Sequence, residues 1–199
     1  MVKTAVLVSG GGTNLQHILD KRGSVINSAE ISLVVSSSEK AYALERAKSC
    51  GIEALTIKDE TELQKALTDR GIELIILAGY MKILSADFTA KWPRRIINVH
   101  PALIPSFCGK GMYGLRVHEA ALGYGVKVTG ATVHFVNEIP DGGEIIMQKA
   151  VSVEDGDTPE ILQRRVMEQA EWQILPAAAE KVAKDIAEKG QAYERIRNI

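Results

Sequence analysis

Short apolar runs rich in β-branched residues alternate with amphipathic segments of helical length through roughly the first half of the chain. This alternation is typical of crossover units on a mainly parallel sheet that is flanked by helices. The strands are expected at about residues 3–8, 31–36, 53–57, 73–77 and 95–99, and the helices at about 14–21, 41–50, 60–70 and 85–91.

The pattern changes after residue 125, where two β-branched segments replace the alternation of strands and helices. They cover residues 126–136 and 144–153, and the turn-rich stretch 137–143 between them is short enough for an antiparallel pair. We therefore predict an α/β fold with a mainly parallel sheet, antiparallel late strands and flanking helices. No repeat or interdomain linker interrupts the pattern, so a single domain over residues 1–199 is expected.

A last helix is expected over about residues 158–188. Thr158 can cap its start, Pro159 suits the first helical position, and Glu160 favours the positive end of a helix. Apolar residues recur after this start at helical spacing, which indicates packing along a sheet. Pro176 predicts a kink or a break within the helix.

Composition and charge narrow the classes of protein to which the chain can belong. With 199 residues, of which 46% are hydrophobic and 25% charged, the chain can bury a substantial core. Its formal net charge of −1 gives no electrostatic field that would attract nucleic acid or an anionic membrane. Local groups must therefore hold any anionic ligand. The two cysteines form neither a metal motif nor a disulfide framework. No apolar segment has the length of a signal peptide or a membrane span, so a cytoplasmic protein is expected.

The fifth predicted strand ends in two chemically capable side chains, Asn98 and His100, before Pro101. Alternate residues of a strand share a face, so an amide and an imidazole point the same way at the strand end, where open α/β sheets bind ligands. Asp141, in an Asp-Gly-Gly sequence, would favour a protonated imidazole if the late strands return toward the centre of the sheet. The alternatives are that Asn98 and His100 are only a hydrogen-bonded polar pair at a strand end, and that the segment with Asp141 is only a hairpin turn. A nucleophilic Cys108 is a weaker hypothesis, because nothing fixes the thiol.

The remaining histidines, His17, His118 and His134, are weaker candidates for chemistry. His134 alternates within a predicted strand, and His118 lies on a predicted helix. None of them has the spacing of metal ligands, so no metal site is expected.

A glycine-rich loop follows the first predicted strand, with Gly10, Gly11 and Gly12 preceding Thr13 and Asn14 at the start of a helix. Free backbone amides and the positive helix end would meet there, which favours a bound phosphate. The alternative is a tight turn in which the glycines only relieve strain. The dinucleotide-binding fingerprint needs a further glycine where the chain has Leu15. This weakens the hypothesis that the protein is an NAD-dependent oxidoreductase. Another alternative is a noncatalytic sensor, which would bind a phosphorylated sugar at the glycine-rich loop and catalyse no reaction.

Five segments of the chain form an ordered set of motifs. They are Ser9-Gly10-Gly11-Gly12-Thr13-Asn14-Leu15, Leu77-Ala78-Gly79-Tyr80-Met81-Lys82-Ile83-Leu84, Asn98-Val99-His100-Pro101-Ala102-Leu103-Ile104-Pro105, Gly130-Ala131-Thr132-Val133-His134-Phe135-Val136 and Asp141-Gly142-Gly143. Together they resemble, over nearly the whole chain, the phosphoribosylglycinamide formyltransferases of purine synthesis. The resemblance implies a Rossmann-like formyltransferase fold and formyl transfer from 10-formyltetrahydrofolate to the amine of 5-phosphoribosylglycinamide, without a metal. It also implies small-molecule partners only, with no nucleic acid or membrane, and a monomer or homodimer.

The resemblance assigns three catalytic roles, motif by motif. Asn98 would donate a hydrogen bond to the oxyanion of a tetrahedral intermediate. His100 would act as general acid and proton carrier. Asp141 would hold the imidazole protonated and help to relay protons.

The resemblance also assigns binding roles. The substrate contacts would be Gly12, Thr13 and Asn14, which bind the phosphate, and Glu171. Glu168 fits the same late motif if the register is shifted, so it is retained as an alternative to Glu171. The folate pocket would be lined by Met81, Lys82, Ile83, Leu84, Asn98, Asn137, Glu138, Ile139, Pro140 and Asp141.

Two segments depart from the family pattern. Residues 58–64 lack the arginine often found there, which removes one expected folate contact. The loop 107–116 is longer than in many members, and its glycine content suits a mobile lid. Related formyltransferases that act on methionyl-tRNA, sugar nucleotides or water share the Asn/His/Asp set but usually carry an extra domain, so they are expected to fit this chain less well.

Overall fold

The computed structural model describes residues 1–197, with side chains through residue 189. The chain divides into two compact units. The first holds Met1–Lys82 together with the chain from Pro176 onward, and the second holds Ile83–Leu175. The expectation of one domain over residues 1–199 stays a prediction.

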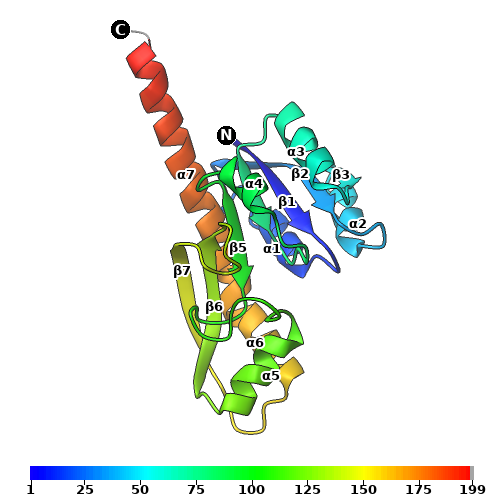
Figure 1. Ribbon diagram of the computed structural model, residues 1–199, viewed down its shortest axis with the longest axis vertical. Helices are drawn as coiled ribbons and strands as arrows, with labels where there is room; N and C mark the ends of the chain where they lie inside the picture. The colour runs from blue at the N-terminus through cyan, green and yellow to red at the C-terminus, as the bar shows by residue number, and fades with distance from the viewer. Residues whose placement is uncertain (198–199) are drawn as a thin grey trace. The chain divides into compact units, whose positions relative to one another are not determined.

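The first unit contains four parallel strands in the order β3-β2-β1-β4, of which Figure 1 labels β1, β2 and β3. The strands are β1 (Val2–Val8), β2 (Ala29–Ser36), β3 (Glu53–Thr56) and β4 (Leu74–Leu77), and the helices between them are α1 (Thr13–Asp20), α2 (Tyr42–Ser49) and α3 (Glu60–Asp69). Every residue of β4 and nearly every residue of β1 is buried. Burial on both faces explains why continuous apolar runs, and not an alternating pattern, mark these strands in the sequence.

The long helix α7 (Trp172–Arg197) belongs to the first unit from Pro176 onward. Glu180 ties it to the start of β2, because its Oε2 accepts hydrogen bonds from the N–H groups of Asn27 and Ser28, each at 2.8 Å. The helix continues through Pro176, so a break there is wrong, and a kink there stays a prediction. Pro176 stands one turn into α7, where its missing N–H costs a single hydrogen bond of a long helix.

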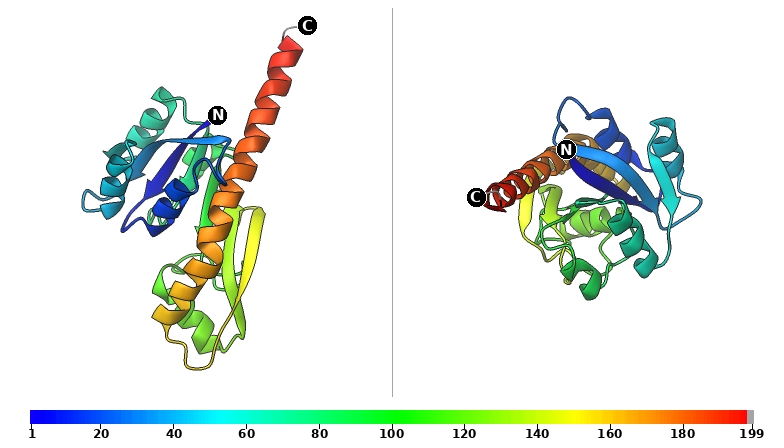
Figure 2. Two further views of the ribbon diagram at one scale, coloured as in Figure 1. Left: turned by 180° about the vertical axis from the view of Figure 1, so that it is seen from behind. Right: turned by 90° about the horizontal axis from the view of Figure 1, so that it is seen from above.

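The second unit contains three antiparallel strands in the order β5-β6-β7. Its elements are α4 (Ala86–Ala90), β5 (Ile96–His100), α5 (Leu115–Tyr124), β6 (Val128–Phe135), β7 (Ile145–Ser152), α6 (Pro159–Val166) and the π-helical turn η1 (Met167–Glu171). Both α6 and η1 pack on the late strands (Figure 2). The predicted α/β fold, with its mainly parallel sheet and antiparallel late strands, is confirmed.

The pairing of β5 with β6 sets the faces of the side chains that matter below. Asn98 lies opposite His134, and His100 lies opposite Thr132. Side chains of directly opposed residues share a face of the sheet, and so do alternate residues of one strand. These four side chains therefore project from the same face of the second unit.

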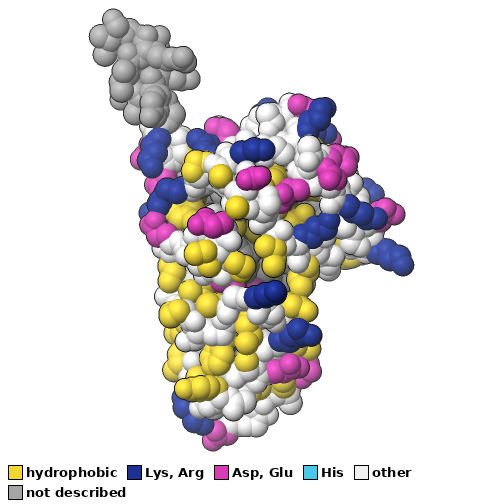
Figure 3. All heavy atoms as spheres, viewed as in Figure 1, with side chains coloured by type: hydrophobic (Ala, Val, Ile, Leu, Met, Phe, Trp, Pro, Cys, Tyr) yellow, Lys and Arg dark blue, Asp and Glu magenta, His cyan; other side chains and the backbone are white. Residues whose placement is uncertain are grey.

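The surface of the second unit exposes several large apolar side chains, and Figure 3 shows apolar surface over one of its faces. Val128, Ile139 and Ile145 are exposed to 53%, 58% and 42%. None of the helices in the described part of the chain combines the length and the apolar character that a bilayer crossing requires.

Candidate active site

The structure brings Asn98, His100 and Asp141 together in the second unit. Asn98 and His100 end β5, whereas Asp141 lies in the loop between β6 and β7. The Nδ1 atom of His100 lies 3.6 Å from Oδ2 of Asp141, and only 4% and 14% of the two side chains are exposed. The antiparallel pairing of β5 and β6 explains the convergence, because it returns the chain to the end of β6 beside Asn98.

The loop that carries Asp141 depends on the two glycines that follow it. Asp141 adopts a left-handed conformation with φ of 57°. A Cβ atom on Gly142 would lie 2.6 Å from Cγ2 of Ile139, and one on Gly143 would lie 1.7 Å from the carbonyl oxygen of Phe135. Any larger residue would push the loop off the end of β6. The Asp-Gly-Gly motif thus fixes the position of a carboxylate, beyond reversing the chain.

The imidazole of His100 is fixed through Nε2, which lies 2.8 Å from the carbonyl oxygen of Phe107. A carbonyl oxygen can only accept, so Nε2 carries a proton, and Nδ1, which faces Asp141, is the nitrogen that gains and loses one. Burial lowers the pKa of His100 more than Asp141 and the Phe107 carbonyl raise it, and His134 lowers it as well. The ring is therefore mainly neutral near pH 7. This differs from the expectation that Asp141 holds it protonated, because desolvation is the larger effect.

The carboxylate of Asp141 is ionised at neutral pH. Burial alone would raise its pKa, but His134, His100 and the N–H of Gly109 together lower that pKa below its usual value. The Gly109 N–H donates to Oδ2 of Asp141 at 2.8 Å. The glycine-rich loop after β5 therefore holds both members of the pair, one through Phe107 and the other through Gly109.

His134 belongs to the same cluster, although the sequence left it among the weaker candidates. It is 1% exposed, and its Nδ1 lies 2.8 Å from the carbonyl oxygen of Phe135, so Nδ1 carries the proton. Its Nε2 lies 3.2 Å from Nδ2 of Asn98 and 3.6 Å from Oδ1 of Asp141. The contact with Asn98 fixes the orientation of that amide. The signal that finds His134 is its position opposite Asn98 in the strand pairing.

His118, on α5, is fully buried, and neither of its ring nitrogens has a hydrogen-bond partner within the described residues. Burial, together with the charge of His100, lowers its pKa to about 4. A second, neutral imidazole thus lies within electrostatic reach of His100.

The glycine loop lies in the first unit, between β1 and α1. Gly12 has φ of 73°, and a Cβ atom on it would lie 2.6 Å from Cβ of Ala43. Ser9 supports the loop from its other end, because its Oγ lies 2.7 Å from Oγ of Ser37 and accepts from the N–H of Met81 at 2.9 Å. Helix α1 has no side-chain cap at Gly12, so the backbone N–H groups of its first turn, which starts at Thr13 and Asn14, suit an anion.

The residues predicted to line the folate pocket fall in both units. Met81 and Lys82 end the first segment of the first unit, and the others belong to the second unit: Ile83, Leu84, Asn98, Asn137, Glu138, Ile139, Pro140 and Asp141. Ile83 is 70% exposed, whereas Leu84 is 7% exposed. The Nζ of Lys82 donates to the carbonyl oxygen of Lys58, which fixes the cation of the motif.

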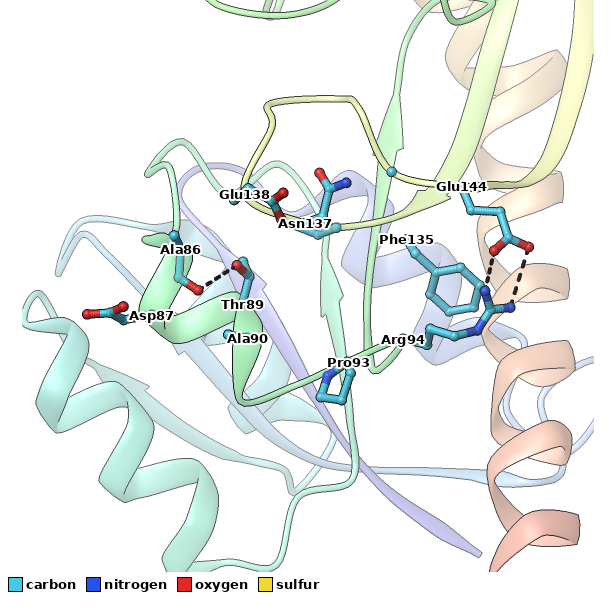
Figure 4. Close-up of a pocket in the computed structure, with 12 residues that line it drawn as sticks. Ala86, Asp87, Thr89, Ala90, Pro93, Arg94, Phe135, Asn137, Glu138 and Glu144 are labelled. Carbon is cyan, nitrogen blue, oxygen red and sulfur yellow. Dashed lines mark hydrogen bonds and ion pairs between the residues drawn. The ribbon is translucent and has the colours of Figure 1, made fainter.

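A pocket of about 570 Å³ opens in the second unit between α4 and the loop after β6 (Figure 4). Asn137 and Glu138 line it, but none of the three predicted catalytic side chains does. On its wall the guanidinium carbon of Arg94 lies 4.4 Å from the ring centroid of Phe135 and its nitrogens pair with Glu144. Within the described residues, no three His, Cys, Asp or Glu side chains form a group that could hold a metal ion.

Both candidates for the late acidic contact, Glu168 and Glu171, lie in the π-helical turn η1, and they differ in burial. Glu171 is 6% exposed, whereas Glu168 faces solvent and pairs with Arg164 at 2.8 Å. A π-helical turn accommodates one extra residue in a helix. Of the two glutamates, Glu171 is the one that the fold buries.

The chain is similar to several known proteins. A family model described as formyl transferase matches residues 2–179. The human trifunctional purine biosynthetic protein adenosine-3 is 41% identical over 95% of this chain, but the chain spans only 19% of that relative. Phosphoribosylglycinamide formyltransferase of Haemophilus influenzae is 40% identical over 88% of this chain and 84% of its own. The crystal structure of glycinamide ribonucleotide transformylase 1 from Symbiobacterium toebii matches with a TM-score of 0.85 at 40% identity, over 93% of this chain and 89% of its own.

Proposed function

Because the chain belongs to the formyl transferase family, and within it to the phosphoribosylglycinamide formyltransferases, we propose that it transfers the formyl group of 10-formyltetrahydrofolate to the amine of 5-phosphoribosylglycinamide. The observation that carries the proposal is the convergence of Asn98, His100 and Asp141. The reaction would serve purine (IMP) biosynthesis in the cytoplasm, in a monomer or homodimer that uses neither a metal nor nucleic acid.

Asn98 stabilises the negative charge that develops when the amine attacks the formyl carbon. Its Nδ2 gives one N–H to Nε2 of His134 and keeps a second N–H for the oxygen that becomes negative. A fixed donor of this kind contributes on the order of 3 kcal/mol to lowering the barrier. His134 is the residue that holds the donor in place.

His100 moves the proton between the two nitrogens of the reaction. Neutral at the start, its Nδ1 takes a proton from the attacking amine, and Asp141, 3.6 Å away, stabilises the imidazolium that results. The same Nδ1 then gives the proton to the departing folate nitrogen, so the ring ends as it began. The Phe107 carbonyl keeps the other nitrogen protonated throughout, which prevents the ring from using the wrong tautomer.

The binding residues present fit the two substrates. The uncapped start of α1 at Gly12, Thr13 and Asn14 suits the phosphate of the acceptor. The apolar side chains of Ile83 and Ile139 are exposed to 70% and 58%, as expected of a surface that receives a flat, largely apolar donor.

The burial of Glu171 supports its assignment to the substrate, whereas the pairing of Glu168 with Arg164 leaves that glutamate a role in the helix.

An absorbance assay for consumption of the formyl donor, with and without the acceptor, tests the proposal. Consumption by purified protein should require 5-phosphoribosylglycinamide and should yield the formylated amide. Equal consumption with water alone would indicate a hydrolase and would contradict the proposal.

A further inference from the structure

Arg46, on α2, connects three parts of the first unit. Its Nε donates to the carbonyl oxygen of Gly11 at 2.8 Å, and its Nη1 donates to Oε1 of Gln16 on α1 at 2.9 Å. Its guanidinium carbon also lies 5.0 Å from the ring centroid of Tyr42. A guanidinium is planar, so two hydrogen bonds and a ring contact fix its orientation as well as its position. The side chain is thereby committed to the glycine loop.

These contacts determine where the N–H groups of the glycine loop point. The Gly10 carbonyl accepts from the N–H of Ala43 at 3.2 Å, and the Gly11 carbonyl accepts from Arg46, so both carbonyls face α2. In a trans peptide, the C=O and the N–H that follows it point in opposite directions. The N–H groups of Gly11 and Gly12 therefore point away from α2. Neither donates to a backbone carbonyl in the described part of the chain.

The charge of Arg46 acts in the same direction as the geometry. A cation on the carbonyl of Gly11 polarises that peptide, which makes the N–H of Gly12 a stronger donor. Gly12 also directly precedes α1, whose positive end adds to the local potential. The formal net charge of the chain is −1, so local groups of this kind must supply the attraction for a doubly charged phosphate.

We propose that Arg46 is a positioning residue for the phosphate monoester of the acceptor, which it serves by holding the N–H groups of Gly11 and Gly12 toward that phosphate. The inference rests on the proposed function for the identity of the acceptor. The loop itself should bind inorganic phosphate whichever acceptor the protein uses.

Two substitutions separate the geometry of Arg46 from its charge. Arg46→Met keeps the apolar stem and removes the guanidinium, whereas Arg46→Lys keeps a charge without the planar pair of donors. Arg22→Met is the matched control, because Nε of Arg22 also donates to a backbone carbonyl, that of Leu19, at 3.1 Å. The readouts are kcat, the KM of each substrate, and the Kd of inorganic phosphate by calorimetry.

We expect Arg46→Met to raise the acceptor KM and the phosphate Kd about tenfold or more, as loss of a charge-assisted hydrogen bond should. The kcat and the KM of the formyl donor should stay within about threefold of wild type, because the catalytic side chains are untouched. Arg46→Lys should remain impaired at least about fivefold, and Arg22→Met should match wild type.

An unchanged acceptor KM and phosphate Kd in Arg46→Met would overturn the proposal. So would full binding by Arg46→Lys, which would make charge alone sufficient, or loss of secondary structure by circular dichroism in both variants, which would make the residue structural. If wild type binds phosphate through Arg46 but does not formylate the acceptor, the proposed function fails while the role of Arg46 stands.

Discussion

The buried imidazole of His118 predicts how the stability of the fold depends on pH. Its pKa falls from an ordinary 6.5 to about 4 in the folded protein, because burial disfavours the charged ring. Between these values the unfolded chain binds a proton that the folded chain does not. The contribution of His118 to stability is therefore complete above pH 6.5 and is lost as the pH falls toward 4. The loss is about 1.4 kcal/mol per pH unit, or roughly 3 kcal/mol over the whole interval.

Replacing the ring by an apolar side chain should remove this dependence. His118→Leu also removes two buried nitrogens that have no hydrogen-bond partner within the described residues, so its stability at pH 7.5 should lie within about 1 kcal/mol of wild type. At pH 5 the variant should gain about 2 kcal/mol relative to wild type. His17→Gln is the control, because burial also lowers the pKa of His17 but the ring is only partly buried, so its effect on the comparison should be smaller.

Urea unfolding at pH 7.5, 6.5, 5.5 and 5.0, followed by circular dichroism, measures the free energy of unfolding of all three proteins. The difference between His118→Leu and wild type should grow steadily as the pH falls below 6.5. Parallel curves for the two proteins over this range would refute the reasoning, since they would mean that His118 is protonated in the folded state.

Three further predictions concern the catalytic cluster. Asn98→Ala should lower kcat about 100- to 1,000-fold with little change in the KM of either substrate. A rise in KM as large as the fall in kcat would argue against an oxyanion donor. His134→Phe leaves the Asn98 amide without its acceptor, so kcat should fall about tenfold while circular dichroism stays unchanged; wild-type kcat would show that the bond is dispensable. Asp141→Asn removes the charge that raises the pKa of His100, so the acidic limb of the kcat/KM profile should move to lower pH and kcat should fall about 100-fold. If the acidic limb stays at the same pH, Asp141 does not influence the protonation of His100.

Local pattern was sufficient for part of the site. The alternation of a strand places Asn98 and His100 on one face whatever the rest of the chain does, and the structure has them there. The nearness of Asp141 depends on which strand pairs with which, and that pairing is set by long-range packing. His134 was undervalued for the same reason, because its importance comes from the register that sets it opposite Asn98.

Two other features lay beyond what local pattern contains. The π-helical turn at Met167–Glu171 contains both Glu168 and Glu171 and decides which of them is buried, so the sequence pattern alone leaves the two as alternatives. The direction of the His100 pKa follows from the balance between desolvation and a nearby carboxylate. Burial enters that balance as its largest part, and it becomes known only with the packed structure.

The hydrogen bonds from Phe107 and Gly109 link the position of their loop to the acidity of the site. A displacement of that backbone would free the second nitrogen of His100 and strip a donor from Asp141 in one movement. The tautomer of His100 and the ionisation of Asp141 would then change together. A small molecule that wedges this segment outward should thus silence proton transfer without occupying the place of either reactant, a mode of inhibition that competition with substrate would not relieve.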